Sequence, residues 1–177
     1  MKIAIIGYSG AGKSTLAQKL SQFYSIPKLH MDTLQFQPGW QDSDRDWMKT
    51  EMKNFLTNHS DWVIDRNYSW SCYEERMQES DQIIFLNFSP WTCLLRAFKR
   101  YLKYRGQVRE SMAAGCKEQF NWEFIRWILW DGRKKNAKER YKWIQETYPE
   151  KVIVLRAQKE IDHFLENLAH NKKNQRT

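Results

Sequence analysis

The stretch GYSGAGKST, residues 7–15, decides how this chain folds. It matches the pattern GxxxxGK[ST], in which small residues let the backbone curl so that its N–H groups point inward. The apolar run of residues 2–6 precedes it, and apolar side chains at helical spacing follow it at Leu16, Leu20 and Phe23. A buried strand, a glycine-rich loop and an amphipathic helix are therefore expected in that order, which is the local context of a phosphate-binding loop.

This loop predicts the binding of a nucleoside triphosphate together with magnesium. Gly12 opens the following helix, whose N-terminal N–H groups and dipole favour an anion. Lys13 is expected to reach the β- and γ-phosphates, and the hydroxyl of Ser14 to bind Mg2+. The alternative is an ordinary glycine-rich turn, and the strand before the loop together with the helix after it argues against that alternative.

Beyond the loop, short apolar runs alternate with longer segments of helical spacing. This alternation is typical of a parallel sheet covered on both faces, so the expected fold class is α/β, with three layers and a parallel five-stranded sheet. One domain is expected over residues 1–177, with a polar tail at residues 170–177 that frays. The expected strands are residues 2–6, 27–30, 61–65, 82–88 and 151–155, and the expected helices are residues 13–24, 44–57, 90–103, 121–146 with a break near 131–132, and 160–168.

The net charge of +8 is concentrated in one part of the chain. Residues 96–142 contain 14 Lys and Arg against five Asp and Glu, whereas residues 1–95 contain nine against 11. An anionic partner is therefore expected near residues 96–142, and either the phosphates of a nucleotide or a nucleic acid backbone would satisfy this charge. Within this part we expect a helical, basic lid at residues 104–133, which would exclude water from a phosphate site.

The cysteine and hydropathy patterns exclude several classes of protein. Cys72, Cys93 and Cys116 lie far apart with no CxxC pair, which argues against a zinc site and a disulfide framework and suits a reducing cytoplasm. The first apolar run is too short for a signal peptide, and no stretch is long enough for a transmembrane helix. No membrane partner is expected, and no feature of the sequence indicates an oligomeric state.

Two aspartates follow predicted strands and are candidates for the phosphate chemistry. Asp65 closes the strand at residues 62–64, and Asp32 follows residues 29–31. Because ligands collect at the carboxyl ends of strands in open α/β sheets, both acids are predicted to face Lys13. One of them, expected to be Asp65, would serve the hydrated magnesium. Each could instead cap the next helix.

Arginines in the basic part are candidates for stabilising a transferred phosphoryl group, because they carry charge without titrating. Arg96 and Arg100 are four residues apart on one face of the expected helix at residues 90–103, and we expect them to be functional. A solvated helix face is the favoured interpretation for Lys134, Lys135, Lys138 and Lys142.

Several of these residues together resemble a known group of proteins. The loop, DWVID at residues 61–65, FLNFSP at residues 85–90 and the pair Arg96 and Arg100 resemble the adenylate kinase-like group of P-loop kinases. Over residues 2–168 the chain more narrowly resembles the bacterial DNA topology modulation proteins (FlaR-like). That narrower resemblance includes HMDTL at residues 30–34, followed by Pro38 and Trp40, and the dipeptide Gly115-Cys116.

The resemblance implies a P-loop NTPase fold of the adenylate kinase type and a role for individual residues. Arg96 would lie against the adenine, Arg100 would reach the phosphates, Arg133 would be a flap arginine acting on the transferred group, and Arg156 with residues 157–158 would lie near the adenine edge. Asp32 resembles the base of nucleoside and small-metabolite kinases. The ATP phosphates and Mg2+ would be held by Gly7, Ser9, Gly10, Ala11, Gly12, Lys13, Ser14 and Thr15.

The sequence also departs from the adenylate kinase pattern. That pattern has Asp-Gly at the strand end, whereas here Arg66 follows Asp65. The paired acids of the adenylate kinase lid are not evident between Arg105 and Arg133. Both departures count against a nucleoside monophosphate as acceptor.

Two main hypotheses follow. In the first, the chain is a kinase that transfers the γ-phosphate of ATP to a small-molecule or nucleotide acceptor, with Asp32 as base or anchor. Trp40 and Tyr68 would then stack on the acceptor, and Arg66, Arg45 or Arg76 would hold an acceptor phosphate.

In the second hypothesis, the chain is a nucleic-acid-associated regulator that uses ATP as a switch. Residues 96–142 would then follow a phosphate backbone, with Trp122, Trp127 and Trp130 interleaved. The absence of a helix-turn-helix or zinc-finger pattern disfavours this hypothesis. A plain ATPase switch is a third and weaker interpretation.

Overall fold

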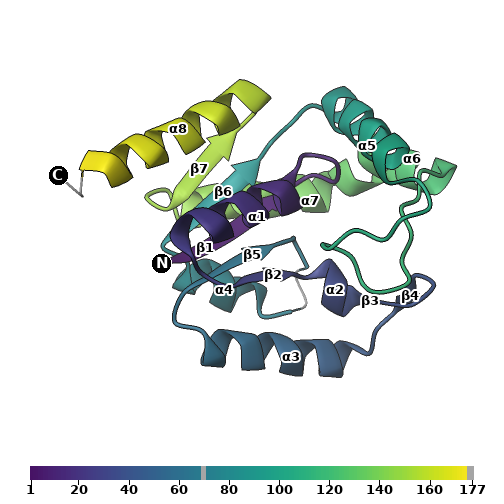
Figure 1. The fold of residues 1–177 in the computed structure, drawn as a ribbon, viewed down its shortest axis with the longest axis horizontal. Coiled ribbons are helices and arrows are strands. Elements are labelled where there is room, and N and C mark those ends of the chain that lie inside the picture. The colour runs from purple at the N-terminus through teal and green to yellow at the C-terminus, as the bar shows by residue number, and fades with distance from the viewer. Residues whose placement is uncertain (69–70, 175–177) are drawn as a thin grey trace.

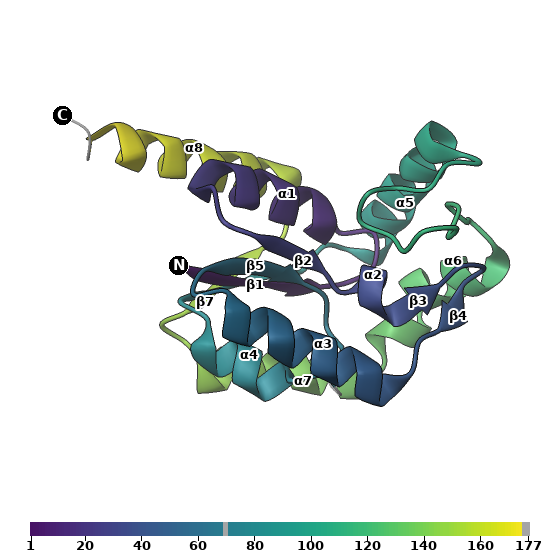
Figure 2. The same cartoon turned by 60° about the horizontal axis from the view of Figure 1, so that its bottom comes forward.

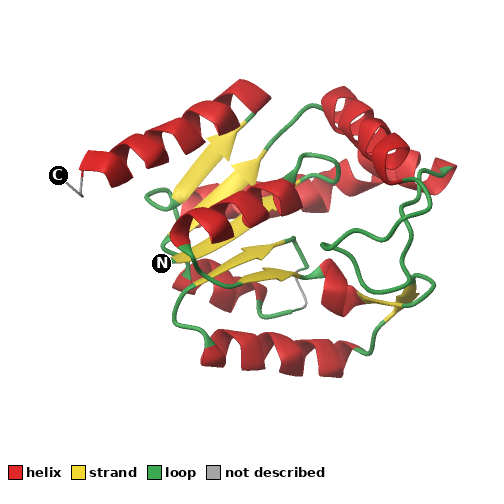
Figure 3. Ribbon diagram, in the orientation of Figure 1, coloured by secondary structure: helices red, strands yellow, loops and turns green. Residues whose placement is uncertain are grey.

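The computed structural model describes residues 1–68 and 71–174, without the side chains of residues 172 and 173. Its main strands are β1 (Lys2–Gly7), β2 (Lys28–His30), β5 (Trp62–Asp65), β6 (Gln82–Leu86) and β7 (Val152–Leu155). They form one parallel five-stranded sheet in the order β2-β5-β1-β6-β7, seen as arrows in Figure 3. The predicted sheet is therefore confirmed.

Helices cover both faces of this sheet, as the sequence predicts. α1 (Lys13–Tyr24) and α8 (Gln158–Asn174) lie on one face, and α3 (Arg45–Asn58), α4 (Tyr73–Glu79) and α7 (Lys135–Thr147) lie on the other (Figure 2). α5 (Pro90–Tyr104) and α6 (Trp122–Leu129) lie beyond the ends toward which the strands point (Figure 1). None of the helices in the ranges 1–68 and 71–174 is both long and apolar enough to cross a lipid bilayer.

The central position of β1 in the sheet explains its burial. Its residues Ile3, Ala4, Ile5 and Ile6 are fully buried, because neighbouring strands flank it on two sides and helices cover both faces. A strand buried on both faces reads as a continuous apolar run rather than an alternating one. The loop that follows β1 is therefore attached to a fully buried central strand.

Local capping marks the start of α5, close to residue 90, where the sequence predicts a helix. Ser89 precedes α5, its hydroxyl accepts a hydrogen bond from the N–H of Thr92, and Pro90 takes the first helical position. The predicted break near residues 131–132 is a short 3-10 helix, η1 (Asp131–Arg133), between α6 and α7.

The predicted fraying from residue 170 is wrong as far as residue 174, because α8 continues to Asn174. No Gly or Pro interrupts this segment, so nothing in it ends the helix earlier. Residues 175–177 lie outside the described residues.

Short elements around residues 32–42 were not anticipated by the sequence. They are α2 (Asp32–Gln35) and an antiparallel hairpin of β3 (Phe36–Gln37) and β4 (Gln41–Asp42). Strands of two residues carry no periodic signal, so the sequence gives no indication of this hairpin. Gly39 and Trp40 have positive φ angles in its turn, which closes the hairpin beside the site described below.

The expected helical lid at residues 104–133 is helical only in its last part. Residues 105–121 form an irregular loop, called the lid loop here, with isolated bridges from Arg105 to Glu118 and from Val108 to Lys117. Gly106 and Gly115 adopt positive φ angles there, which interrupt a helix. The lid loop instead extends toward α2 and β4 (Figure 1). It docks on the hairpin, where the Cys116 thiol donates to the carbonyl of Gln37 over 3.2 Å.

Candidate functional site

The phosphate-binding loop lies between β1 and α1, where the sequence places it. Gly10 and Gly12 have φ angles of 82° and 101°, in the region that favours glycine. A Cβ on Gly10 would lie 2.4 Å from the carbonyl oxygen of Cys93 in α5, so α5 packs directly against the loop. Glycine is therefore required at this position both for its backbone conformation and for the close approach of α5.

Lys13 is buried beneath this loop. Its ammonium donates to the carbonyls of Gly7 and Tyr8 over 2.8 and 2.9 Å. Burial, followed by the repulsion of Arg66, lowers the pKa of Lys13 to about 7. An anion entering the loop would relieve this unfavourable environment.

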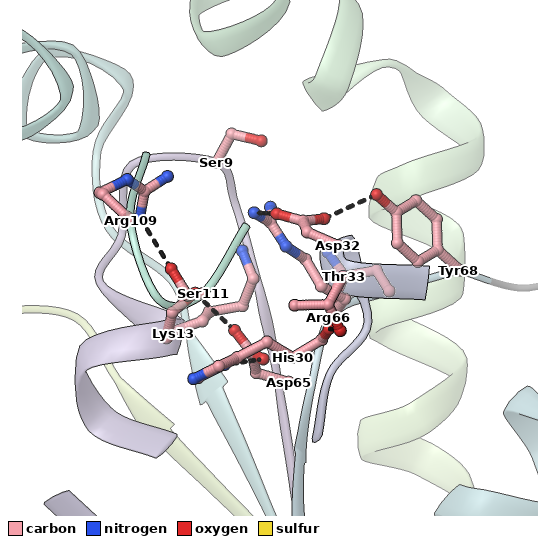
Figure 4. Close-up of polar contacts among 12 residues, drawn as sticks. Ser9, Lys13, His30, Asp32, Thr33, Asp65, Arg66, Tyr68, Arg109 and Ser111 are labelled. Carbon is pink, nitrogen blue, oxygen red and sulfur yellow. Dashed lines mark hydrogen bonds and ion pairs between the residues drawn. The ribbon is translucent and has the colours of Figure 1, made fainter. Parts of the chain in front are cut away.

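Asp65 lies beside Ser14, as the prediction of a metal site requires. The Ser14 hydroxyl donates to one Asp65 carboxylate oxygen over 2.7 Å. His30 Nδ1 lies 2.8 Å from the other carboxylate oxygen of Asp65 (Figure 4). A serine hydroxyl and a carboxylate are hard oxygen ligands, and Mg2+ is typically held by one or two such protein groups together with phosphates and water. No cluster of three or more His, Cys, Asp or Glu suited to a metal occurs in the part of the chain that the structure describes. The pair therefore fits Mg2+ bound with a nucleotide.

Asp32 lies at the start of α2 and is almost fully buried. One of its oxygens accepts a hydrogen bond of 2.8 Å from the Tyr68 hydroxyl, and the other pairs with the guanidinium of Arg66 (Figure 4). Three of the four residues predicted for the acceptor are thus in direct contact. The fourth, Trp40, lies in the hairpin and donates its indole N–H to the carbonyl of Lys117 over 3.1 Å.

Arg66 occupies the position where the adenylate kinase pattern has glycine, and it keeps a glycine-like backbone. Its φ angle is 119°, which is rare and strained for a residue with a side chain. Such strain persists only where the surroundings enforce it, and it often marks a functional site. Here this backbone accompanies the pairing of Arg66 with Asp32.

A small chamber of about 140 Å³ opens over the loop. Four arginines line it from three different segments: Arg66 follows β5, Arg96 and Arg100 belong to α5, and Arg109 belongs to the lid loop. Lys13 lines it from the phosphate-binding loop. This arrangement concentrates positive charge around a space where a phosphate chain would lie. The lining residues are Gly10, Gly12, Lys13, Ser14, Thr15, Arg66, Arg96, Arg100 and Arg109.

A larger cavity of about 620 Å³ adjoins this chamber. The two spaces share Gly10, Lys13, Arg66, Arg100 and Arg109. The cavity adds the predicted acceptor residues Asp32, Trp40 and Tyr68, together with further aromatic walls. These aromatic residues are Phe36, Phe124, Trp127 and Tyr141.

Of the two arginines predicted to lie near the adenine, Arg96 and Arg156, only Arg96 lines the chamber. Arg96 lies over the Phe88 ring and donates to the side chain of Gln158 over 2.6 Å. This brings it beside the segment expected near the adenine. Arg156 follows β7 as expected, but its side chain is exposed and lines neither space.

Arg133 does not face the site as the resemblance implies. Its guanidinium donates to the carbonyls of Ile128 and Phe88 and stacks over the Tyr8 ring, 3.7 Å from the ring centre. These contacts hold it against Phe88 and Tyr8, and it lines neither the chamber nor the cavity. We therefore do not include Arg133 among the groups that contact a ligand.

The alternative acceptor arginines also point elsewhere. Arg76 is fully buried and donates to the carbonyls of Ser71 and Tyr68 over 3.2 Å each, so it supports the loop after β5. Arg45 is exposed on α3 and lines neither space.

Sequence reasoning gave no specific role to two residues of the site. Arg109 was only one of many arginines in the basic part, and Glu118 was not singled out. Glu118 is buried in the lid loop and binds both Arg100 and Arg109. No local pattern reveals it, because its partners lie nine and 18 residues away.

Comparisons with known proteins agree with this fold. No family model matches the chain, and no curated protein matches its sequence. The deoxyadenosine kinase of M. mycoides with bound dCTP is 20% identical to it, covering 96% of this chain and 100% of its own, with a TM-score of 0.54. The same kinase with the products dCMP and dCDP gives 19% identity, the same coverage and a TM-score of 0.53.

A second kinase is similar to the same extent. Shikimate kinase from Bacteroides thetaiotaomicron is 16% identical, covering 98% of both chains, with a TM-score of 0.52. At these identities the similarity shows the fold alone: the chain has the fold of the P-loop kinases. The narrower resemblance to DNA topology modulation proteins stays a prediction.

Proposed function

We propose that this protein is a magnesium-dependent kinase that transfers the γ-phosphate of ATP to a hydroxyl group of a small molecule. One observation carries the proposal: the phosphate chamber opens into a larger cavity, and the two share Lys13, Arg66, Arg100 and Arg109. A donor and an acceptor bound in these two spaces would meet at the shared residues. The similar structures are named as kinases of deoxyadenosine and of shikimate, two hydroxylated small molecules.

In this proposal the triphosphate lies along the loop of residues 7–15. Lys13, Arg100 and Arg109 stabilise the charge that spreads over the transferred oxygens. Ser14 and Asp65 would hold Mg2+, which would neutralise part of the phosphate charge. Arg96 and Gln158 face the adenine end of the nucleotide.

The acceptor lies in the cavity of 620 Å³, against Trp40 and Tyr68. Asp32 accepts the proton of the acceptor hydroxyl while that oxygen bonds to the γ-phosphorus. The bond from the γ-phosphorus to the bridging oxygen breaks, and ADP leaves. Arg66 orients Asp32 through their ion pair.

The test is turnover with Mg2+ and ATP across a panel of hydroxylated acceptors, including nucleosides and hydroxylated carboxylic acids. Phosphorylated product is detected by mass spectrometry. We expect Lys13→Ala to lower kcat/KM by about 100-fold or more, as loss of one charge-stabilising donor commonly does. Lys19→Ala is the matched control, because Lys19 is exposed on the same helix and lines neither space.

Two results would count against the kinase. Unchanged ATP affinity and turnover in Lys13→Ala would show that the loop of residues 7–15 is not the site of the phosphate donor. ADP release without any phosphorylated acceptor across the panel would favour an ATPase switch instead.

A further inference from the structure

Glu118 joins two arginines that come from different parts of the chain. Its Oε1 accepts from Nε of Arg100 over 2.8 Å and lies 2.7 Å from Nη2 of the same residue. Its Oε2 accepts from Nε of Arg109 over 2.5 Å. Arg100 belongs to α5 and Arg109 to the lid loop, so a single carboxylate ties the helix to the loop over the phosphate chamber.

This pairing leaves both arginines able to bind a phosphate. A guanidinium has five N–H donors in a rigid plane. Arg100 uses Nε and Nη2 on Glu118, and Arg109 uses Nε on Glu118 and Nη1 on the Ser111 hydroxyl over 2.9 Å. Among the described residues, Nη1 of Arg100 and Nη2 of Arg109 have no acceptor. Since both side chains line the chamber, the pairing fixes each plane while donors remain available.

Without such a partner the arginines would repel each other. Burial is the main cause that lowers the pKa of Arg100, and the charge of Arg109 acts in the same direction. Glu118 acts in the opposite direction, both by its charge and by its hydrogen bond. The carboxylate of Glu118 therefore offsets the repulsion between the guanidinium groups of Arg100 and Arg109 and lets both lie beside the chamber.

The position of Glu118 is itself fixed. Its backbone N–H donates to the carbonyl of Gln107 over 3.0 Å. The residues just before it dock on the hairpin, through Cys116 to Gln37 and through Trp40 to the carbonyl of Lys117. Its side chain is only 3% exposed. A group that is to orient others needs this rigidity.

We propose that Glu118 is a positioning residue that aligns Arg100 and Arg109 on the terminal phosphate of ATP. It does not contact the nucleotide itself, and its effect passes through the two arginines. The inference rests on the proposed function, because it assumes that a triphosphate occupies the chamber.

The experiment compares the affinities of ADP and of a non-hydrolysable ATP analogue, both with Mg2+, by calorimetry. In Glu118→Gln the side chain keeps its length, but one end becomes an amide NH2 that cannot accept from a guanidinium. We expect the preference for the ATP analogue over ADP to fall about tenfold, the loss of one good charge-assisted hydrogen bond. Simple removal of a negative charge would act the other way, because it would favour the more highly charged ATP analogue.

Removing the two arginines tests whether Glu118 acts through them. In the Arg100→Ala/Arg109→Ala background, Glu118→Gln should leave the ratio of the two affinities unchanged, because effects that share one path are not additive. Glu118→Asp keeps the charge with a shorter reach, so it should give an intermediate ratio. It provides the measurement if thermal unfolding shows that Glu118→Gln does not fold.

The outcomes separate this inference from the proposed function. An unchanged ratio in folded Glu118→Gln or Glu118→Asp overturns the inference alone. A full effect that persists without the two arginines also overturns it. If the wild-type protein binds neither nucleotide, the proposed function itself fails, and the inference fails with it.

Discussion

At the scale of single residues, Lys13 lies in an environment that disfavours its charge and that a bound anion would make favourable. Lys13 is buried, and the nearby charge of Arg66 opposes its own. Its ammonium is bonded to two carbonyls of the loop rather than to an acid. In a complex with a triphosphate, phosphate oxygens would replace these carbonyls as partners of the ammonium. We therefore expect Lys13 to be more fully protonated in the complex than in the free protein.

This environment predicts a proton uptake when nucleotide binds. The pKa of Lys13 is lowered to about 7 in the free protein, and bound phosphates raise it again because they favour the charged form. At pH 8 the free protein therefore holds a largely neutral Lys13 and the complex a charged one. Affinity for nucleotide should fall as the pH rises through about 7, because protonation must then accompany binding.

The measurement is calorimetry of the ATP analogue at pH 8 in two buffers that differ in ionisation enthalpy. We expect the apparent enthalpies to differ, corresponding to uptake of up to one proton. Lys13→Arg is the control, because arginine does not titrate in this range. Equal enthalpies in both buffers for the wild-type protein would contradict the prediction.

At the scale of elements, the loop and α5 are packed as one unit. A Cβ on Gly10 would meet the backbone of Cys93, whereas one on Gly12 would meet only the flexible guanidinium of Arg96. α5 also carries Arg96 and Arg100, which line the chamber. The distance between loop and helix therefore decides where these two arginines lie relative to the phosphates.

A glycine comparison tests this packing. Gly39 has a φ angle of 81° and no atom within 4 Å of a Cβ, whereas Gly10 has a φ angle of 82° and the carbonyl of Cys93 at 2.4 Å. Gly39→Ala should therefore cost about 1 kcal/mol of stability, from the backbone conformation alone. Gly10→Ala should cost at least about 1 kcal/mol more, because backbone must move.

Urea unfolding gives the two free energies of unfolding, and calorimetry gives the nucleotide affinities. Only Gly10→Ala should weaken binding of the ATP analogue. An equal loss of unfolding free energy in the two variants would mean that α5 moves away from the loop at no cost. The loop and the helix would then not form one packed unit.

At the scale of the whole molecule, the cations of residues 96–142 divide into a few that line the site and a larger number that are exposed. Arg100 and Arg109 line internal spaces and are paired with Glu118. On the exposed part of the basic segment, Lys135 and Lys142 pair with acids four residues away, as expected of a solvated helix face. Arg100 and Arg109 are therefore placed to meet a small anion in the site, whereas the exposed cations of residues 96–142 leave binding of a nucleic acid backbone to be tested.

Salt dependence distinguishes these two ligands. Between about 50 and 200 mM salt, binding to a DNA duplex through six or more phosphates should weaken by about 1,000-fold or more. We expect the affinity for the ATP analogue with Mg2+ to fall by less than about tenfold, because its site is buried and less screened. Fluorescence titration with a labelled duplex and with a labelled nucleotide measures both. A duplex that binds tightly and is not displaced by ATP would favour the nucleic-acid hypothesis.

Much of the fold followed from local signals. The loop of residues 7–15, the strand β1 and the helix that begins at residue 90 each depend on neighbours in the chain, and each was predicted correctly. The hairpin and the irregular lid loop were missed, because two-residue strands and loops lack periodicity. The positions of Asp32 and Asp65 followed from the rule that ligands collect at strand ends.

The sequence by itself determined the phosphate loop, the order of strands and helices, and the acids at the strand ends, because local backbone preferences and apolar periodicity encode them. Only the tertiary structure decided which charges face the site. Arg109 lines the chamber, whereas Arg133 binds the carbonyl of Phe88 and lines neither space, although both are arginines of the same basic segment. Their directions depend on partners that are not neighbours in the chain: Glu118, nine residues away, for Arg109 and Phe88, 45 residues away, for Arg133. Side-chain pairing across such separations leaves no periodic trace in a single sequence.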